Sequence, residues 1–291
     1  MVNGRFHRPF ILKTIFLMID LDNIQFAYPH KTWLFNDFNW QAARGQAWAV
    51  LGPSGCGKTT LLYLLAGLQF PSRGQVRVDG HNIDRPRPDT GLILQDYGLL
   101  PWSTVLNNVK LGLRIRQLYG PDGRHAPRLP QSNPQAAHQA TLSWLERLGL
   151  AGLAGQYPGQ LSGGQRQRVA IARTLVLQPD LLLMDEPFSS LDAVTRLSLR
   201  ELTLGLWREQ GFTFVVVTHA IEEAAHLGQY ILVLGSPPHQ QPEVIVNPCF
   251  GEPELEESDQ YRALLRELRA RIAPTLQSTA SRPARPAMEA E

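Results

Sequence analysis

Apolar positions in the first hundred residues follow two different periods. Short apolar or alternating runs at 19–28, 47–51, 74–80 and 90–94 predict β-strands. Beyond the glycine-rich stretch that follows the second run, residues 59–68 (TTLLYLLAGL) carry the pattern of an apolar helix. The sequence therefore predicts a strand, a loop and a helix in succession at this point.

The middle of the chain carries only the longer, helical period. Helices are predicted at 104–118, 135–148 and 165–177, with no strand between them. The first two are separated by a loop at 119–135 that has four prolines and no apolar period, which is typical of a surface loop. We therefore expect an inserted helical subdomain at about 96–178.

Strands and helices alternate again after residue 180. The runs LLLMD (181–185), TFVVVT (213–218) and YILVLG (230–235) predict strands, and 192–209 and 220–227 predict helices between them. A βαβ order of this kind indicates a largely parallel sheet, and ligands bind at the carboxyl ends of its strands.

Both ends of the chain lack the pattern of the main domain, which we place at 18–250. Residues 1–17 are predicted to be an N-terminal arm or a misassigned start, because Lys13 interrupts a signal-like apolar stretch and no cleavage site follows. A C-terminal helix is expected at 251–274, followed by a disordered tail at 275–291.

Composition narrows the class of protein only slightly. The 28 Lys+Arg against 26 Asp+Glu give a formal charge of +2, so we expect no general nucleic-acid partner. Two cysteines, Cys56 and Cys249, provide no disulfide framework and fit a reducing compartment. No run reaches the roughly 18 to 20 apolar residues of a membrane-spanning helix. We therefore expect a cytosolic chain that reaches a membrane only through partner proteins.

The stretch GPSGCGKT has the spacing of a complete phosphate-binding loop between the predicted strand and helix. Backbone N–H groups would hold the β-phosphate at the helix N-terminus, Lys58 would bridge the β- and γ-phosphates, and Thr59 would hold Mg²⁺. An ordinary glycine turn would not require so many fixed positions. We therefore predict ATP or GTP binding by Gly52, Pro53, Ser54, Gly55, Cys56, Gly57, Lys58, Thr59 and Thr60.

Polar residues stand at the ends of three predicted strands. Asp185 is expected to join Thr59 in holding Mg²⁺, and Glu186 is expected to be the general base that activates water. The alternative is that both acids cap the helix that follows them. His219 is expected to reach the γ-phosphate, and Gln95 to touch Mg²⁺ or the attacking water.

These motifs, together with LSGGQ, SSLD and THAIEEA in the same order, resemble those of the ATP-binding cassette (ABC) ATPases over residues 19–235. The resemblance implies an α/β fold: a P-loop NTPase parallel-sheet core with an antiparallel β subdomain and an inserted α-helical subdomain. It also implies a dimer of two copies that share ATP.

In this family the second glycine turn binds the γ-phosphate of ATP held by the partner copy; its residues here are Ser162, Gly163, Gly164 and Gln165. A hydroxyl and the free N–H groups of a helix start are suited to an anion, although a simple helix cap is the alternative. The resemblance further implies that Asp192 lies in the loop that crosses the dimer seam and that Tyr28 stacks on adenine.

The stretch that follows Gln95 resembles the importers of nitrate, sulfonates, taurine and thiamine pyrimidine precursors. In that branch this segment docks on a separate membrane permease, and the candidate docking residues here are Tyr97, Leu99, Leu100, Pro101 and Trp102. The alternative is that they belong to the core of the helical subdomain. Ala220 and the long proline-rich loop depart from the branch and weaken any choice of solute.

Together these observations predict the Mg-ATP-hydrolysing subunit of an importer, peripheral to the cytoplasmic face of the membrane. Its partners would be a second copy, the permease and, indirectly, an extracytoplasmic solute-binding protein. One alternative is a soluble ABC ATPase that acts on nucleic acid or ribosomes, and a second is an exporter subunit. A non-catalytic regulatory cassette is opposed by Lys58, Asp185 and Glu186.

Overall fold

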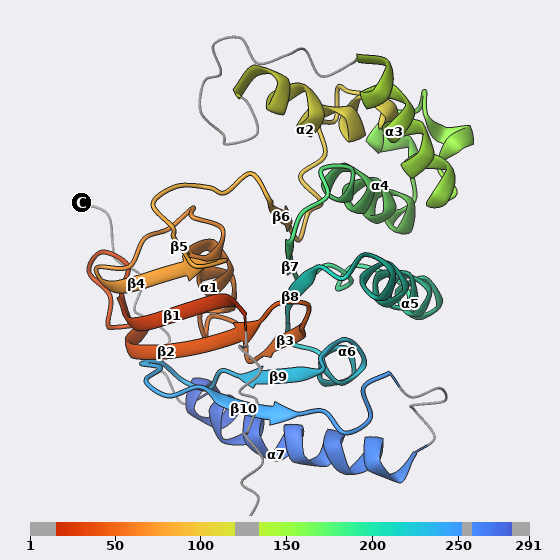
Figure 1. Ribbon diagram of the computed structural model, residues 1–291. Helices are drawn as coiled ribbons and strands as arrows, with labels where there is room; N and C mark the ends of the chain where they lie inside the picture. Colours follow the sequence, from red (N-terminus) through yellow and green to blue (C-terminus); the bar gives the residue numbers. More distant parts are fainter. Residues whose placement is uncertain (1–15, 120–133, 252–257, 281–291) are drawn as a thin grey trace, which may run out of the picture.

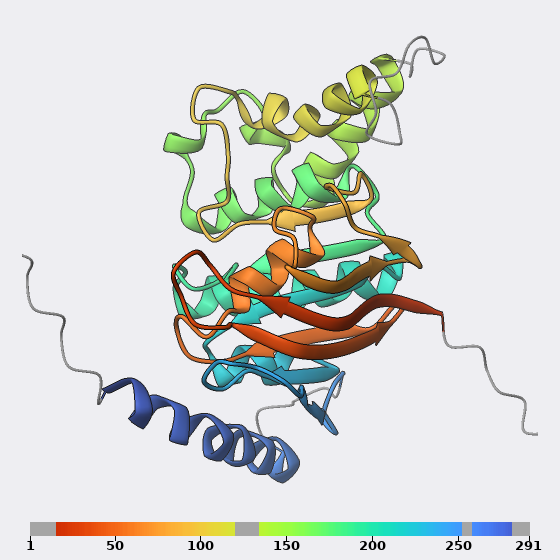
Figure 2. The same cartoon turned by 90° about the vertical axis from the view of Figure 1, so that its left-hand side faces the viewer.

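The computed structural model describes residues 16–119, 134–251 and 258–280, and the N-terminal arm expected at 1–17 therefore lies almost entirely outside the described residues. Two β-sheets lie side by side, one helix is packed between them, and further helices cover the outer face of the larger sheet (Figure 1). The helical region lies at one end of the molecule and the C-terminal helix at the other (Figure 2).

The larger sheet has six strands in the order β10-β9-β3-β8-β7-β6, and every pair except β10 with β9 is parallel. Strands β3, β7 and β8 are buried along their whole length, which explains why their sequences are continuously apolar rather than alternating. The strands are β3 (Ala47–Leu51), β6 (Thr90–Ile93), β7 (Leu181–Asp185), β8 (Thr213–Thr218), β9 (Tyr230–Val233) and β10 (Glu243–Val246).

The smaller sheet is antiparallel, with the order β2-β1-β4-β5. Its strands are β1 (Leu17–Phe26), β2 (Phe35–Ala43), β4 (Arg73–Val78) and β5 (His81–Asn82). Strand β2 was not predicted because the period of two breaks near its start: the buried Phe35 and Phe38 are three apart, with Asp37 in a left-handed conformation between them. This irregularity hides the strand from pattern analysis.

Helix α1 (Lys58–Leu65) lies between the two sheets and contacts β4, β7 and β8. Its leucines, including Leu61 and Leu65, are buried in one apolar cluster with residues of both sheets. Because α1 is clamped from two sides, the loop that precedes it is fixed relative to the carboxyl ends of the parallel strands.

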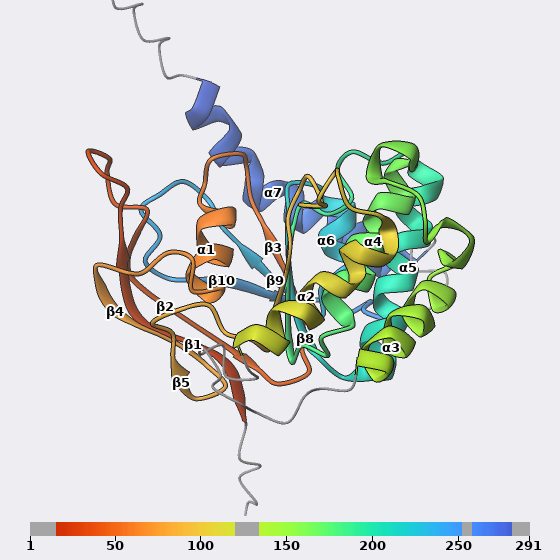
Figure 3. The ribbon, with the colours of Figure 1, turned by 90° about the horizontal axis from the view of Figure 1, so that it is seen from above.

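Three helices cover the other face of the large sheet: α4 (Gly163–Leu175), α5 (Ala193–Gln210) and α6 (Ile221–Leu227) (Figures 1 and 3). Helix α2 (Val105–Tyr119) packs on α4 and on α3 (Pro134–Arg147). Short 3-10 turns at Ala151–Leu153 and Pro158–Gln160 complete the helical region. Of the loop expected at 119–135, residues 120–133 lie outside the described part; Tyr119 belongs to α2, and Pro134 begins α3.

The predicted start of the main domain and the predicted limits of the C-terminal helix need correction. Strand β1 already begins at Leu17, inside the expected arm. Helix α7 spans Asp259–Ala280 and not 251–274, so the tail expected from residue 275 was placed too early. Pro274 lacks a backbone N–H, but the residues after it retain theirs, and the helix continues past it to Ala280. No helix in the described part of the chain is long and apolar enough to cross a membrane.

Candidate active site

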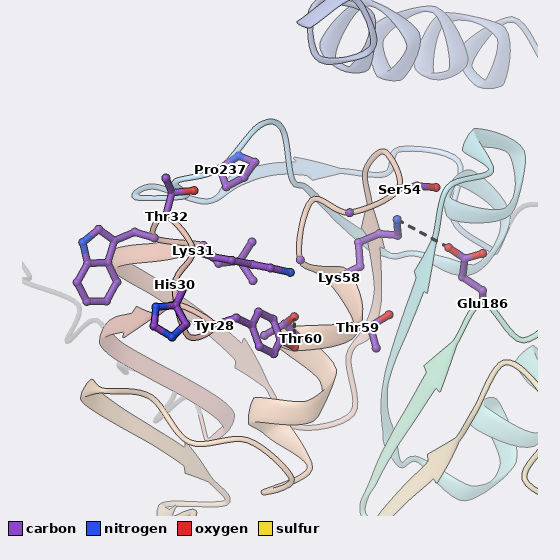
Figure 4. A pocket seen from close by; sticks show the side chains of 14 residues that line it. Tyr28, His30, Lys31, Thr32, Ser54, Lys58, Thr59, Thr60, Glu186 and Pro237 are labelled. Atoms are coloured by element: carbon purple, nitrogen blue, oxygen red, sulfur yellow. Dashed lines mark hydrogen bonds and ion pairs between the residues drawn. The ribbon is translucent and has the colours of Figure 1, made fainter. Parts of the chain in front are cut away.

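The phosphate-binding loop borders a cavity of about 870 Å³ at the carboxyl end of β3 (Figure 4). Gly55 and Gly57 have φ values of +79° and +110°, which are accessible to glycine at little cost. The loop leads into the N-terminus of α1, where backbone N–H groups and the helix dipole favour an anion. The cavity is lined by Tyr28, His30, Lys31, Thr32, Trp33, Leu34, Ser54, Gly55, Gly57, Lys58, Thr59, Thr60, Glu186 and Pro237.

Lys58 supplies positive charge at the loop end of this cavity. Its side chain is only 4% exposed, and its Nζ donates to the carbonyl oxygens of Gly52 and Pro53 at 2.9 and 3.0 Å. The same Nζ lies 3.8 Å from Oε1 of Glu186 (Figure 4). A buried ammonium group beside a helix N-terminus makes this the anion-binding end of the cavity.

The carboxylate of Asp185 faces the first turn of α1. Thr59 Oγ1 donates to Asp185 Oδ1 at 3.1 Å. Burial raises the pKa of Asp185, and the hydrogen bond from Thr59 offsets part of that rise. Asp185 and Glu186 do not cap the next helix, because α5 begins at Ala193 with Asp192 as its N-cap. The alternative considered for the two acids is therefore wrong.

Glu186 and His219 form a hydrogen-bonded pair at the ends of neighbouring strands. Nδ1 of His219 lies 2.9 Å from Oε2 of Glu186. Glu186 has a φ of +43°, and its backbone N–H donates to Val217 at 3.0 Å. The imidazole is 53% exposed, so its other nitrogen is accessible from solvent. One carboxylate oxygen therefore faces Lys58, and the other is oriented by a histidine.

Gln95 lines a second cavity of about 830 Å³. Thr59 and Asp185 also line this cavity, and Thr59 lines both. Hydroxyl, carboxylate and amide oxygens thus face one space, and these are the donors that Mg²⁺ prefers. The three residues predicted to hold a metal are brought to the same place.

Tyr28 borders the end of the first cavity away from Glu186 (Figure 4). Its hydroxyl is 3.0 Å from Thr60 Oγ1, and its ring packs edge-on against Phe26. The ammonium group of Lys31 lies over the ring, 5.5 Å from its centroid. A planar base that stacked on the face covered by Lys31 would displace its ammonium group.

The second glycine turn lines neither of these two cavities. Ser162 caps α4: its Oγ accepts the Gln165 N–H at 3.3 Å, and Gln165 Oε1 accepts the Ser162 N–H at 2.9 Å. A Cβ on Gly164 would lie 2.5 Å from a methyl carbon of Thr195, so the glycine allows close approach of α4 to α5. Within one chain the turn is thus a helix cap.

Asp192 lies beside that turn and likewise caps a helix. Its Oδ1 accepts the Thr195 N–H at 3.0 Å. Hydrogen bonds from the backbone and side chain of Thr195 lower the pKa of Asp192. The structure therefore groups the predicted site residues into two sets: those around the cavities, and the two caps outside them.

The five candidate docking residues do not form one surface. Tyr97 is 7% exposed and belongs to the core, with its hydroxyl 2.8 Å from Ser190 Oγ. Trp102 is 74% exposed, and Pro101 is also exposed. Leu99 and Leu100 are half-buried. The expectation of a single apolar docking cluster is wrong for Tyr97 because its ring fills the space between α4 and the loop before α5.

Two buried residues that hold functional segments were not predicted from the sequence: one holds the docking segment, and the other contacts the phosphate loop. Asn108 is buried and bonds the backbone of Leu100, Ser103 and Thr104. It falls on the buried face of α2, between Val105 and Val109, and a polar residue at an apolar position is the signal that could have found it. His239, whose ring contacts the phosphate loop, follows a loop-like sequence that gives no such signal.

Comparison with known proteins decides the family. The family model described as ABC transporter matches residues 35–189. The chain belongs to the ABC transporter family, as one of its ATPases. A taurine import ATP-binding protein of Pseudomonas aeruginosa is 43% identical over 205 residues, which is 70% of this chain and 73% of that protein. One of Yersinia pestis is 41% identical over 223 residues, 77% of this chain and 82% of that protein.

Solved structures agree with this assignment. A dimeric ABC cassette in a post-hydrolysis state, bound to ADP and Pi, is 29% identical with a TM-score of 0.66 and covers 79% of this chain and 98% of its own. The predicted fold class is confirmed. The ABC ATPase binds and hydrolyses ATP, which resolves the initial choice between ATP and GTP.

Proposed function

We propose that this ATPase drives uptake of a small sulfonate, with taurine as the first candidate, through a separate permease. The 41 to 44% identity to taurine and aliphatic-sulfonate import proteins supports the direction of transport and the solute class. The observation that carries the ATPase part is the placement of Glu186 between Lys58 and His219 at the mouth of the phosphate loop.

In this proposal Glu186 is the general base. A carboxylate that faces the phosphate end of the cavity removes a proton from the attacking water. His219 holds Glu186 through Nδ1, and its other ring nitrogen reaches toward the γ-phosphate. Lys58 neutralises charge on the phosphates, and Gln95 orients water from the neighbouring cavity, which shares Thr59 with the first.

The Mg²⁺ ion would be held by Thr59, Asp185 and Gln95. Their oxygen donors fit it, since a hydroxyl and a carboxylate already lie 3.1 Å apart at the first turn of α1. When bound, Mg²⁺ neutralises charge on the β- and γ-phosphates during transfer. On the protein side, Tyr28 would stack on adenine at the far end of the cavity, and the N–H groups of the phosphate loop would hold the phosphates.

A second copy would complete each site. Ser162 to Gln165 and Asp192 line neither of the two cavities described above, which fits a role toward the ATP of a partner. Next to them Val194 is 81% exposed and Leu197 is 46% exposed, so apolar surface surrounds these caps. A closed two-fold dimer would pair each glycine turn with the phosphate loop of the other copy.

The permease would dock on Pro101 and Trp102. Asn108 fixes the backbone beneath them, and Arg173 donates to the carbonyl oxygens of Tyr97 and Gly98 at 2.7 and 2.6 Å. A large exposed indole on a rigid segment is a suitable anchor for a partner. The subunit would then lie at the cytoplasmic face of the membrane, with an extracytoplasmic binding protein delivering solute to the permease.

Purification of the tagged chain from detergent-solubilised membranes tests this proposal. We expect a stoichiometric permease, and ATP-dependent taurine uptake after reconstitution of that complex into vesicles with its binding protein. Trp102→Ala should lose the permease, whereas Ile115→Ala, an exposed apolar residue of α2, should retain it. Recovery of ribosomal protein or nucleic acid in place of a membrane protein would support the soluble ATPase instead.

A further inference from the structure

His239 lies behind the phosphate-binding loop, in the connection between β9 and β10. Its backbone is held on both sides: its N–H donates to Leu34 and its carbonyl accepts from Asn36, both at 2.9 Å. The ring is buried and packs at 5.5 Å against the ring of Phe35. The imidazole is thus fixed in position by the small sheet.

The ring reaches the loop through one short hydrogen bond. His239 Nε2 lies 2.7 Å from the carbonyl oxygen of Cys56, at the centre of the glycine-rich stretch. A carbonyl oxygen only accepts, so Nε2 carries the hydrogen and donates it. Burial lowers the pKa of His239, which favours the neutral ring with its single N–H directed at the loop.

This bond determines which way one peptide group of the loop faces. The peptide between Cys56 and Gly57 is trans, so its C=O and its N–H point in opposite directions. With the carbonyl of Cys56 turned toward His239, the N–H of Gly57 is directed away from His239. Gly57 lines the nucleotide cavity, and its φ of +110° lies in a region that glycine adopts at little cost.

The same connection also forms part of the cavity wall, since Pro237 lines it two residues before His239 (Figure 4). We propose that His239 is a positioning residue of the ATP site, whose Nε2–H orients the Cys56–Gly57 peptide so that the Gly57 N–H faces the bound phosphates. This role rests on the proposed function of the loop. In this proposal His239 affects how the loop binds phosphate. It does not contact Glu186, so it takes no part in the activation of water.

Two substitutions of similar length separate the hydrogen bond from the packing. His239→Gln keeps an N–H donor at the end of the side chain, and His239→Met does not. His226→Met is the control, because His226 is a similarly buried histidine that lies 2.7 Å from Glu201, away from the loop. For each protein we would measure the Kd for ATP, then KM and kcat, at a temperature below every melting transition.

We expect His239→Met to raise the Kd and KM for ATP about tenfold with kcat at saturating ATP little changed, because the loss of one oriented donor weakens ground-state phosphate binding. His239→Gln should recover most of the affinity, and His226→Met should leave it unchanged. Equal ATP affinity in the Gln and Met variants would overturn the inference, including when both have wild-type affinity. If the wild-type chain neither bound nor hydrolysed ATP, that result would instead refute the proposed ATP-binding function of the loop.

Discussion

Replacement of Asn108 by alanine tests whether one buried amide holds the proposed docking segment. Asn108 Oδ1 accepts the Leu100 N–H at 2.8 Å, and Nδ2 donates to Leu100, Ser103 and Thr104 at 3.1, 2.9 and 3.1 Å. Asn107 is the matched control: the same residue type on the same helix, with a 3.3 Å contact to the exposed Arg114.

The hydrogen bonds of Asn108 determine the size of the effect. The amide has two N–H groups for three carbonyl oxygens, so the side chain supplies about three full hydrogen bonds, each contributing about 1 kcal/mol. We therefore expect Asn108→Ala to lower the free energy of unfolding by about 3 kcal/mol, partly because buried backbone groups lose their partners. Asn107→Ala should change it by less than about 0.5 kcal/mol.

Urea denaturation gives the two free energies, and hydrogen exchange locates the change. In Asn108→Ala the Leu100 amide should exchange faster, because its hydrogen-bond acceptor is gone. The exchange rates of amides in β3 and β8 should rise only by the amount that the lower global stability accounts for. Equal destabilisation by the two substitutions, or unchanged exchange at Leu100, would refute the reasoning that this amide organises the segment.

Two further predictions concern the phosphate loop. Gly52→Ala should abolish ATP binding, measured with a fluorescent nucleotide, because the new Cβ would lie 2.5 Å from the Leu234 carbonyl oxygen. Gly152→Ala is the control and should bind ATP normally, because open space surrounds that glycine. Equal ATP binding by the two variants would contradict the steric argument. Burial lowers the pKa of His239, so just below its ordinary value of 6.5 the unfolded chain binds more protons than the folded protein. Unfolding free energies should therefore fall more steeply for the wild type than for His239→Gln as the pH drops below about 6.5, and parallel curves would contradict this.

The central strands of the large sheet were predictable because they are buried on both faces. The predicted limits of β3, β7 and β8 coincide with the observed ones. Strand β2 was missed because Asp37 breaks the alternation, and β5 because a strand of two residues carries no period. The end of α7 was misplaced because helix continuation through Pro274 depends on the residues after it.

The candidate site was predictable only where motif residues stand at strand ends. Asp185, Glu186 and His219 could be placed from that rule, and the structure brings them to one edge of the sheet. The sequence did not distinguish a buried Tyr97 from an exposed Trp102, since both belong to one apolar run. The bond from His239 to the loop joins residues 183 positions apart and leaves no trace in a local pattern.

The central claim is that Glu186 activates the water that attacks ATP. The most direct measurement is ATP turnover by Glu186→Gln, with nucleotide affinity and sedimentation measured on the same sample and Glu222→Gln, an exposed glutamate of α6, as the control. We predict that Glu186→Gln binds ATP and accumulates as an ATP-dependent dimer while its turnover falls by at least about 100-fold. Turnover close to that of the wild type would contradict the assignment of the base.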